Sequence, residues 1–217
     1  MVVVSRRVAP TRPAHGNQAR ADRTRALAID VTVTLVLKEG FAAATGRHIA
    51  DEAGVTWGVI QYHFGDRDGL LMAVVDRGFG ELLRALESLP PATPDTTTRD
   101  RVETVVTAAW EAMSSPTARA ASEILIGTRA ARGPEAAGHV RQLATTFTTL
   151  GRMVDNDLDP TRSAAVGDHM LTTLRGMIAT QLVMPRPVDT AKDRRVLVDV
   201  LTSYIHNDQI EKADPDS

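Results

Sequence analysis

The segment of 20 residues from Thr45 to Phe64, TGRHIADEAGVTWGVIQYHF, most restricts how this chain can fold. Thr45 and Thr56 each stand where a hydroxyl can accept a hydrogen bond from a free backbone N–H at the start of a short helix. Between the two short helices, Gly54 permits the left-handed turn that ends the first helix and redirects the chain. Two short helices joined by a tight glycine turn predict a helix-turn-helix.

The outward face of the second short helix indicates whether the motif is a DNA-binding unit or an ordinary corner between two helices. Its side chains are those of Thr56, Trp57, Gln61, Tyr62 and His63. A solvated helix face usually carries Glu or Lys, whereas this face has no acidic residue and offers hydroxyl, aromatic, amide and imidazole groups. Such groups suit hydrogen bonds and stacking against a partner, so the face favours DNA recognition over the plain corner.

The rest of the chain has helical spacing, and Ser115–Pro116 and Asp159–Pro160 are helix start signals, each a capping residue ahead of a proline. Helices are predicted at about 22–40, 46–53, 57–63, 67–88, 160–183 and 191–207, with three more between the Pro90–Thr98 linker and Asp159. The β-branched run Ile29–Thr34 locally favours a strand, but the length of its segment and the stop at Gly40 fit a helix better. The predicted fold is therefore all-α, with about nine helices.

Composition excludes several classes of protein and site. With no cysteine, the chain has no disulfide, zinc finger, thiol nucleophile or iron–sulfur ligand. No metal site, cofactor or catalytic residue is expected, because His139 and His169 lack ligand partners at helical spacing and no nucleotide-binding or nucleophile motif occurs. No apolar run approaches the ~18 residues of a membrane helix, so no membrane contact and a cytoplasmic location are expected.

Charge is distributed unevenly along the chain. Residues 1–25 hold six arginines against one acid, Asp22, although the whole chain has a net charge of -2. A basic arm ahead of a mildly acidic body indicates contact with a polyanion at one end, or a solubilising tail. Charge alone does not decide between these two interpretations.

The run from Thr24 to Leu71 resembles the DNA-binding domain of the tetracycline-repressor (TetR) family. The resemblance rests on Gly40–Phe41, Thr45, Ile49–Ala50, Ala53–Gly54–Val55, Gly58, Tyr62–His63–Phe64, Arg67 and Leu70. It implies a three-helix DNA-binding head and a larger helical body that binds an effector and dimerises. The expected divisions are a flexible basic arm (1–20), a helix-turn-helix domain (21–66), a ligand-binding and dimerisation domain (67–208) and a polar tail (209–217).

Together, the resemblance and the outward face name the predicted DNA contacts. These are Thr45, Thr56, Trp57, Gly58, Gln61, Tyr62, His63 and Arg67. Arg67 stands where the family usually has a phosphate-binding lysine, and the arm arginines add attraction to phosphates. Thr56, Trp57 and Gln61 are the side chains expected at base edges, although Trp57 equally fits a partly buried staple between helices.

The body is rich in methionine and contains the remaining tryptophan. On the residues alone, core filling is the better interpretation, whereas the family resemblance implies a pocket for a ligand. The predicted ligand-binding residues are Trp110, Met113, Glu123, Phe147, His169 and Met177.

These observations predict a regulator of transcription and not an enzyme. We expect a homodimer that represses by binding a palindromic operator in double-stranded DNA, and that a small, largely apolar effector releases. The alternative is a helical carrier or enzyme whose helix-turn-helix is vestigial. The last two long helices carry surplus apolar residues, among them Leu174 and Leu201, and are predicted to form a four-helix bundle with a second copy.

Overall fold

The computed structural model describes residues 14–134, 137–138, 141, 151–154 and 158–213. Its elements are α1 (Ala14–Glu39), the 3-10 turn η1 (Phe41–Ala43), α2 (Gly46–Glu52), α3 (Trp57–Phe64), α4 (Arg67–Glu87), α5 (Thr98–Met113), α6 (Pro116–Gly127), α8 (Gly151–Val154), α9 (Pro160–Val183) and α10 (Ala191–Ala213). Every regular element of the described residues is helical, which confirms the predicted all-α class. None of these helices is long and apolar enough to cross a membrane.

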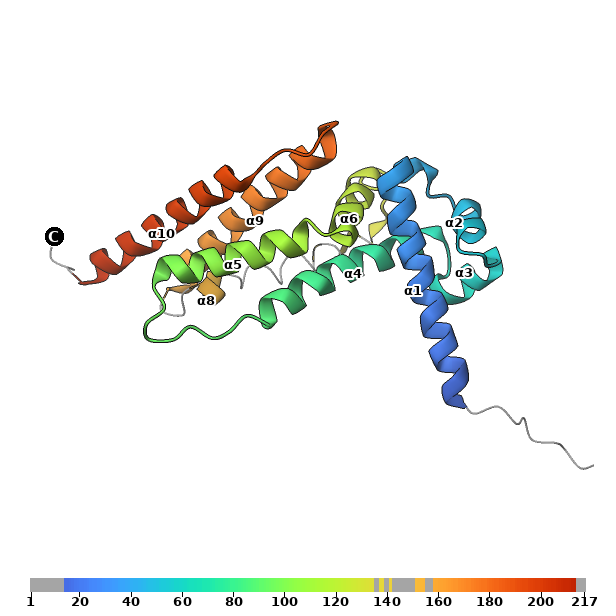
Figure 1. Ribbon diagram of the computed structural model, residues 1–217, viewed down its shortest axis with the longest axis horizontal. Helices are drawn as coiled ribbons and strands as arrows, with labels where there is room; N and C mark the ends of the chain where they lie inside the picture. The colour runs from blue at the N-terminus through green and yellow to red at the C-terminus, as the bar shows by residue number, and fades with distance from the viewer. Residues whose placement is uncertain (1–13, 135–136, 139–140, 142–150, 155–157, 214–217) are drawn as a thin grey trace, which may run out of the picture.

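The helices form a small head and an elongated body (Figure 1). The head consists of α1, α2 and α3, and α4 runs from it into the body, where α5, α9 and α10 lie along one another. The short helix α6 packs on both α4 and α1, between the head and the body. This placement makes α6 part of both regions.

Most helix starts follow the capping residues predicted from the sequence. The Thr45 hydroxyl accepts a hydrogen bond from His48 N at 3.3 Å, and Ser115 and Asp159 cap α6 and α9 ahead of a proline. The predicted cap by the Thr56 hydroxyl is wrong. Val59 N, a donor that such a cap would use, donates instead to the backbone oxygen of Thr56 at 3.0 Å, and Thr56 is exposed.

Two helix ends differ from the sequence prediction. Helix α1 begins at Ala14 and not at Asp22, so residues 14–20 of the expected arm are helical. The Gln18 amide donates to Asp22 Oδ1 at 3.0 Å, a pair four residues apart that supports this extra length. Helix α10 continues to Ala213, beyond the expected end near 207. Much of the helix predicted from Gly133–Pro134 onward lies outside the described residues.

Two apolar cores hold the molecule together. The body core joins α4, α5, α8, α9 and α10 through residues such as Leu86, Val105 and Leu174. The head core joins α1, α2, α3 and α4, and also takes in Ala120, Ala121 and Ile124 from α6. Phe79 of α4 packs against both cores. The head and α6 are therefore one packed unit, with Phe79 at its junction with the body.

The residues exposed on α9 and α10 differ from those predicted to form the dimer face. Leu174 and Leu201 are 0% and 2% exposed within this single chain, so their placement on a dimer face is wrong. Their burial follows from their contacts across the body core with α5 and with each other's helices. Among the residues of α10 up to 207, the exposed large apolar side chains are instead those of Val196, Val200 and Tyr204.

Candidate nucleic-acid interface and effector cavity

The turn between α2 and α3 fixes the outward face of α3. Gly54 has a φ of 64°, and Val55 N donates to Ala50 O across the turn. Ile49 and Ile60 are fully buried beneath it. Because this side of α3 is held in the head core, its other side is open to a partner. That side presents the predicted residues Thr56, Gly58, Gln61 and Tyr62, all exposed.

Trp57 is half-buried and packs against the head core. Its ring lies over the first residue of α2, since a Cβ added at Gly46 would sit 2.6 Å from Trp57 Cζ3. Of the two interpretations left open by the sequence, this geometry supports the staple between α2 and α3. It leaves Thr56 and Gln61 as the better candidates for base edges.

The contact between Trp57 and Gly46 predicts that a side chain at position 46 destabilises the protein. Alanine at the first position of a helix ordinarily stabilises relative to glycine, by up to about 1 kcal/mol. We expect Gly46→Ala to destabilise the protein instead, by about 1–3 kcal/mol, because the added methyl must displace the indole. Thermal unfolding and tryptophan fluorescence measure both effects. Gly133→Ala, where no atom lies within 4 Å of an added Cβ, is the control. A stabilised Gly46→Ala protein would refute the staple.

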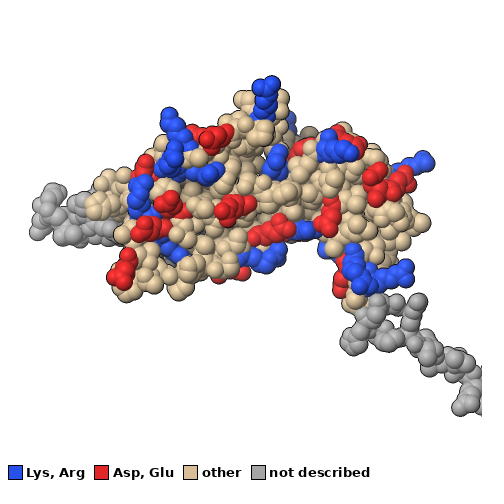
Figure 2. All heavy atoms as spheres, viewed as in Figure 1, with Lys and Arg blue, Asp and Glu red and all other residues tan. Residues whose placement is uncertain are grey.

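Aromatic and basic side chains continue around the end of α3. The rings of Tyr62 and His63 meet edge to face, 5.1 Å apart, and Tyr62 is 82% exposed. Arg25 of α1 lies over the Phe64 ring at 5.2 Å, which places a cation beside the C-terminal end of α3. In Figure 2, basic side chains gather along the part of α1 that extends beyond the head. Together they offer a cationic border to the polar face of α3.

Arginines on α1 and α2 are better placed than Arg67 to meet phosphates. Arg20, Arg23 and Arg25 are exposed on α1. Arg47 is exposed on α2, where it faces Asp51 at 3.8 Å. The first three belong to the basic segment of residues 1–25, whereas Arg47 was not among the residues predicted to contact DNA, although its position at the start of α2 was an available signal.

Arg67, predicted to contact a phosphate, is held by other residues of the protein. Its Nε donates to Ala44 O at 2.7 Å, and a terminal nitrogen donates to Phe41 O at 3.3 Å. The guanidinium also lies over the Phe41 ring at 4.9 Å. These three contacts tie the start of α4 to η1 and the residue that follows it. Arg67 therefore fixes the head to α4 from within the protein.

Phe41 also connects the head to α6 through two contacts. Glu123 Oε1 accepts a hydrogen bond from Phe41 N at 2.7 Å. The Phe41 ring occupies the space of a missing side chain on α6, since a Cβ added at Gly127 would lie 2.6 Å from it. Glu123 was predicted as a ligand contact, but the structure engages its carboxylate with the head.

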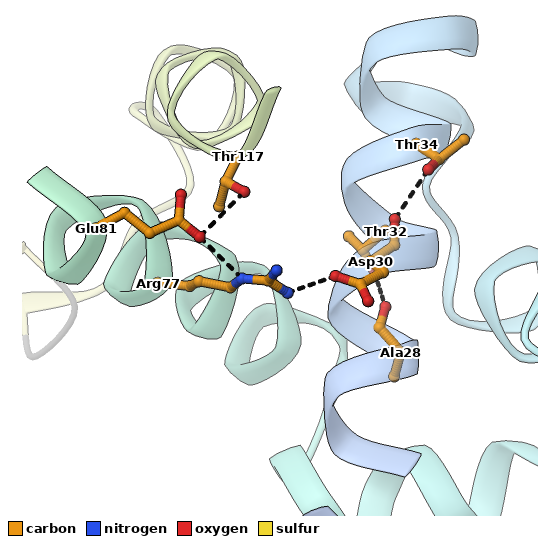
Figure 3. Close-up of polar contacts among 7 residues, drawn as sticks. All are labelled: Ala28, Asp30, Thr32, Thr34, Arg77, Glu81 and Thr117. Atoms are coloured by element: carbon orange, nitrogen blue, oxygen red, sulfur yellow. Dashed lines mark hydrogen bonds and ion pairs between the residues drawn. The ribbon is translucent and has the colours of Figure 1, made fainter. Parts of the chain in front are cut away.

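A second polar link joins α1, α4 and α6 (Figure 3). Arg77 of α4 donates to Asp30 of α1 and, at 3.1 Å, to Glu81 of its own helix. The Thr117 hydroxyl of α6 donates to the same Glu81 oxygen at 3.4 Å. Burial lowers the pKa of Arg77, but the hydrogen bonds and charges of Asp30 and Glu81 outweigh it and raise the pKa overall. Arg77 therefore keeps its positive charge at the centre of this link.

A cavity of about 300 Å³ lies between α4, α6 and α9, with Met113 at its edge. Its walls include Phe79 and Leu82 from α4, Ala121 and Leu125 from α6, and Leu171 and Ile178 from α9. Of the predicted ligand contacts, Met113 lines it. Trp110 stacks under Arg194 at 4.7 Å, His169 is exposed on α9 and Met177 belongs to the body core. Phe147 lies outside the described residues.

Comparison with known proteins places this chain in a family. The model of the family "Bacterial regulatory proteins, tetR family" matches residues 28–74, the segment from the middle of α1 to α4. The chain is 35% identical over 108 residues to the HTH-type transcriptional regulator TtgW of Pseudomonas putida, covering 50% of this chain and 76% of TtgW. The chain belongs to the TetR family. The predicted family and its helix-turn-helix are therefore confirmed, and TetR proteins are transcriptional regulators and not enzymes.

Other similarities extend the comparison. The HTH-type transcriptional regulator SrpR of Pseudomonas putida is 35% identical over 108 residues, and this chain spans about half of its length (48%). Two solved structures share the fold of nearly the whole chain. The fatty acid degradation regulator FadR from Bacillus halodurans has a TM-score of 0.64 at 15% identity, covering 82% of this chain and 94% of FadR. NalD of Pseudomonas aeruginosa, the secondary repressor of the MexAB-OprM multidrug efflux pump, has a TM-score of 0.60 at 19% identity, covering 86% and 97%.

Proposed function

We propose that this TetR-family chain is a homodimeric repressor that binds a palindromic operator and leaves it when a small effector enters the cavity between α4, α6 and α9. The observation that carries the proposal is the exposed polar face of α3, which the buried side chains of Ile49 and Ile60 hold outward and which arginines of α1 and α2 border. A helix with such a face fits the major groove, where base edges present donors and acceptors.

The proposed DNA contacts divide by chemistry. Thr56 and Gln61 face the bases, because their polar groups are exposed and take no part in the head core. Thr45, Gly58, Tyr62 and His63 lie around them, close to the groove walls. Arg25 and Arg47 supply the attraction to phosphates, which is independent of sequence. Trp57 and Arg67 position the helices from inside. The boundary of the two domains remains proposed at 66–67, where Asp66 caps α4.

Two substitutions test these roles on operators selected from a random DNA pool. We expect Gln61→Ala to lose about 1–3 kcal/mol of discrimination at one base position while the salt dependence of binding stays unchanged. Arg25→Ala is expected to weaken binding to every sequence and to reduce the salt slope by about one.

Binding isotherms at several salt concentrations separate the two effects, with Arg186→Ala, exposed in the loop after α9, as the control. Absence of salt-dependent DNA binding by the wild-type protein would contradict the proposed function and favour the carrier alternative. If Arg25→Ala changed only sequence preference, the assignment of roles would be wrong.

The proposed dimer face lies on α9 and α10. Val196, Val200 and Tyr204 recur every four residues on α10 and are 51%, 47% and 41% exposed. On α9, Thr172 and Gly176 are exposed, and no atom lies within 4 Å of a Cβ added at Gly176. An apolar stripe on α10 and an open glycine on α9 allow close packing of two helices from a second copy, which would complete a four-helix bundle.

Helix α6 offers a route from the cavity to the head. Ala121 faces the cavity and also belongs to the head core, and Glu123 on the same helix holds η1. At Gly78, α4 approaches α6 so closely that an added Cβ would lie 3.3 Å from Ala118 Cα. An effector that separates α4 from α6 therefore moves the head. In a dimer, that movement changes the spacing of the two α3 helices, which must match grooves about 34 Å apart.

A further inference from the structure

The cavity contains one charged side chain in an otherwise apolar wall. Of the described residues that line it, Arg175 alone is charged, and Ser122 alone bears another polar side chain. Arg175 lies in the middle of the α9 stripe that faces the cavity, between Leu171 one turn before it and Ile178 one turn after it. Its position is therefore set by the same helical repeat that places the apolar wall.

The guanidinium of Arg175 has no partner among the described residues. No hydrogen bond or ion pair of this side chain occurs there, in contrast to Arg67, Arg77, Arg101 and Arg132. Apolar surroundings desolvate it and lower its pKa, an effect that Asp168 partly offsets by its charge. Arginine nevertheless stays protonated at neutral pH, so the cavity holds a permanent cation. Because Arg175 remains exposed, the cavity is open to solvent at this side chain.

The other polar group adds no competing charge. The Ser122 hydroxyl donates to Ala118 O at 2.9 Å, so its hydrogen is already used. No acidic side chain lines the described part of the cavity. A cationic ligand would therefore be repelled by Arg175, and a neutral apolar ligand would form no ion pair with it, whereas the solvent-open guanidinium is available to an anion.

We propose that the cavity binds an amphipathic organic anion, whose carboxylate pairs with Arg175 and whose hydrocarbon part fills the space between α4, α6 and α9. A carboxylate suits the planar guanidinium because two parallel N–H···O bonds can form. The volume of about 300 Å³ accommodates a short chain or a single ring system. This inference rests on the proposed function and narrows its effector to one chemical class.

Calorimetric titration of the DNA-free protein with octanoate, 1-octanol and octylammonium tests the assignment, since the three probes share one chain and differ in charge. We expect octanoate to bind the wild-type protein at least about tenfold more tightly than the other two probes. Arg175→Gln should lose that advantage while its affinity for 1-octanol stays within about threefold of wild type, and Arg175→Lys should keep part of it. Arg186→Gln is the control for a general loss of positive charge.

Several results would overturn the assignment. The wild type could bind 1-octanol or octylammonium as tightly as octanoate or more tightly. Arg175→Gln could keep the octanoate affinity of the wild type, or the wild type could bind none of the three probes. DNA affinity is measured separately, without and with octanoate. Failure of the ligand-free protein to bind DNA would refute the proposed function and leave the anion site standing. Arg175-dependent octanoate binding that does not release DNA would uphold the anion site and contradict its role as the effector site.

Discussion

Val200→Asp is expected to yield a folded monomer that binds its operator about 10²–10⁴-fold more weakly than the wild type. Val200 is 47% exposed in the single chain, so aspartate there remains hydrated and the monomer keeps its core. In the proposed dimer, the same carboxylate would be buried against a second copy without a partner, which costs several kcal/mol. Loss of the dimer leaves each head to bind its half of the operator alone.

The neighbouring residue provides a matched control. Leu201 is 2% exposed and packs inside the body, so Leu201→Asp should unfold the chain and not merely separate two copies. Sedimentation at micromolar concentration and circular dichroism distinguish the two outcomes. A wild-type monomer, or a Val200→Asp protein that stays dimeric, would remove this face of α10 from the interface.

Glu123→Ala is expected to remove most of the coupling free energy between effector binding and DNA binding. Such coupling is typically about 1–3 kcal/mol, which is a 5–150-fold ratio between the DNA affinities without and with the effector. The substitution leaves Phe41 N without its acceptor and frees η1 from α6. Effector affinity should change little, because Glu123 does not line the described cavity. DNA affinity with and without the effector, measured for both proteins, gives the ratio directly.

Glu123→Gln is the informative partner variant. Its amide oxygen can still accept from Phe41 N at the same position, so it should retain most of the coupling. If the alanine variant kept the full affinity ratio while remaining folded, the Glu123–Phe41 contact would play no part in transmission, and the Arg77–Asp30 link would be the next contact between α4 and α1 to test.

Local sequence patterns predicted the helices and the helix-turn-helix because the hydrogen bonds that start and end each helix join residues only a few positions apart. The caps at Thr45, Ser115 and Asp159 and the turn at Gly54 are determined by neighbouring backbone groups, so the sequence showed them directly. Thr56 is the exception. Its hydroxyl competes with its own backbone oxygen for the free N–H of Val59, and the sequence alone does not show which of the two accepts the hydrogen bond.

Tertiary packing decided the roles of single side chains. Arg67 and Trp57 occupy positions where the sequence allowed an outward contact, but Ala44 O and Gly46 lie within their reach only after α2, α3 and α4 have packed. The outward side of α10 was predicted wrongly for the same reason. Both Val200 and Leu201 are apolar, and the packing of α10 on α5 and α9 determines which of them is covered.

The sequence by itself determined that the part of the chain described by the structure is helical, that residues 45–64 form a helix-turn-helix and that the outer face of this motif's second helix lacks acidic side chains, since each depends on short-range spacing. Only the tertiary structure decided where the cavity lies and that Arg175 faces it. The residues of its walls come from α4, α6 and α9, nearly a hundred positions apart, and burial depends on which helices pack together and not on the neighbours of each residue along the chain.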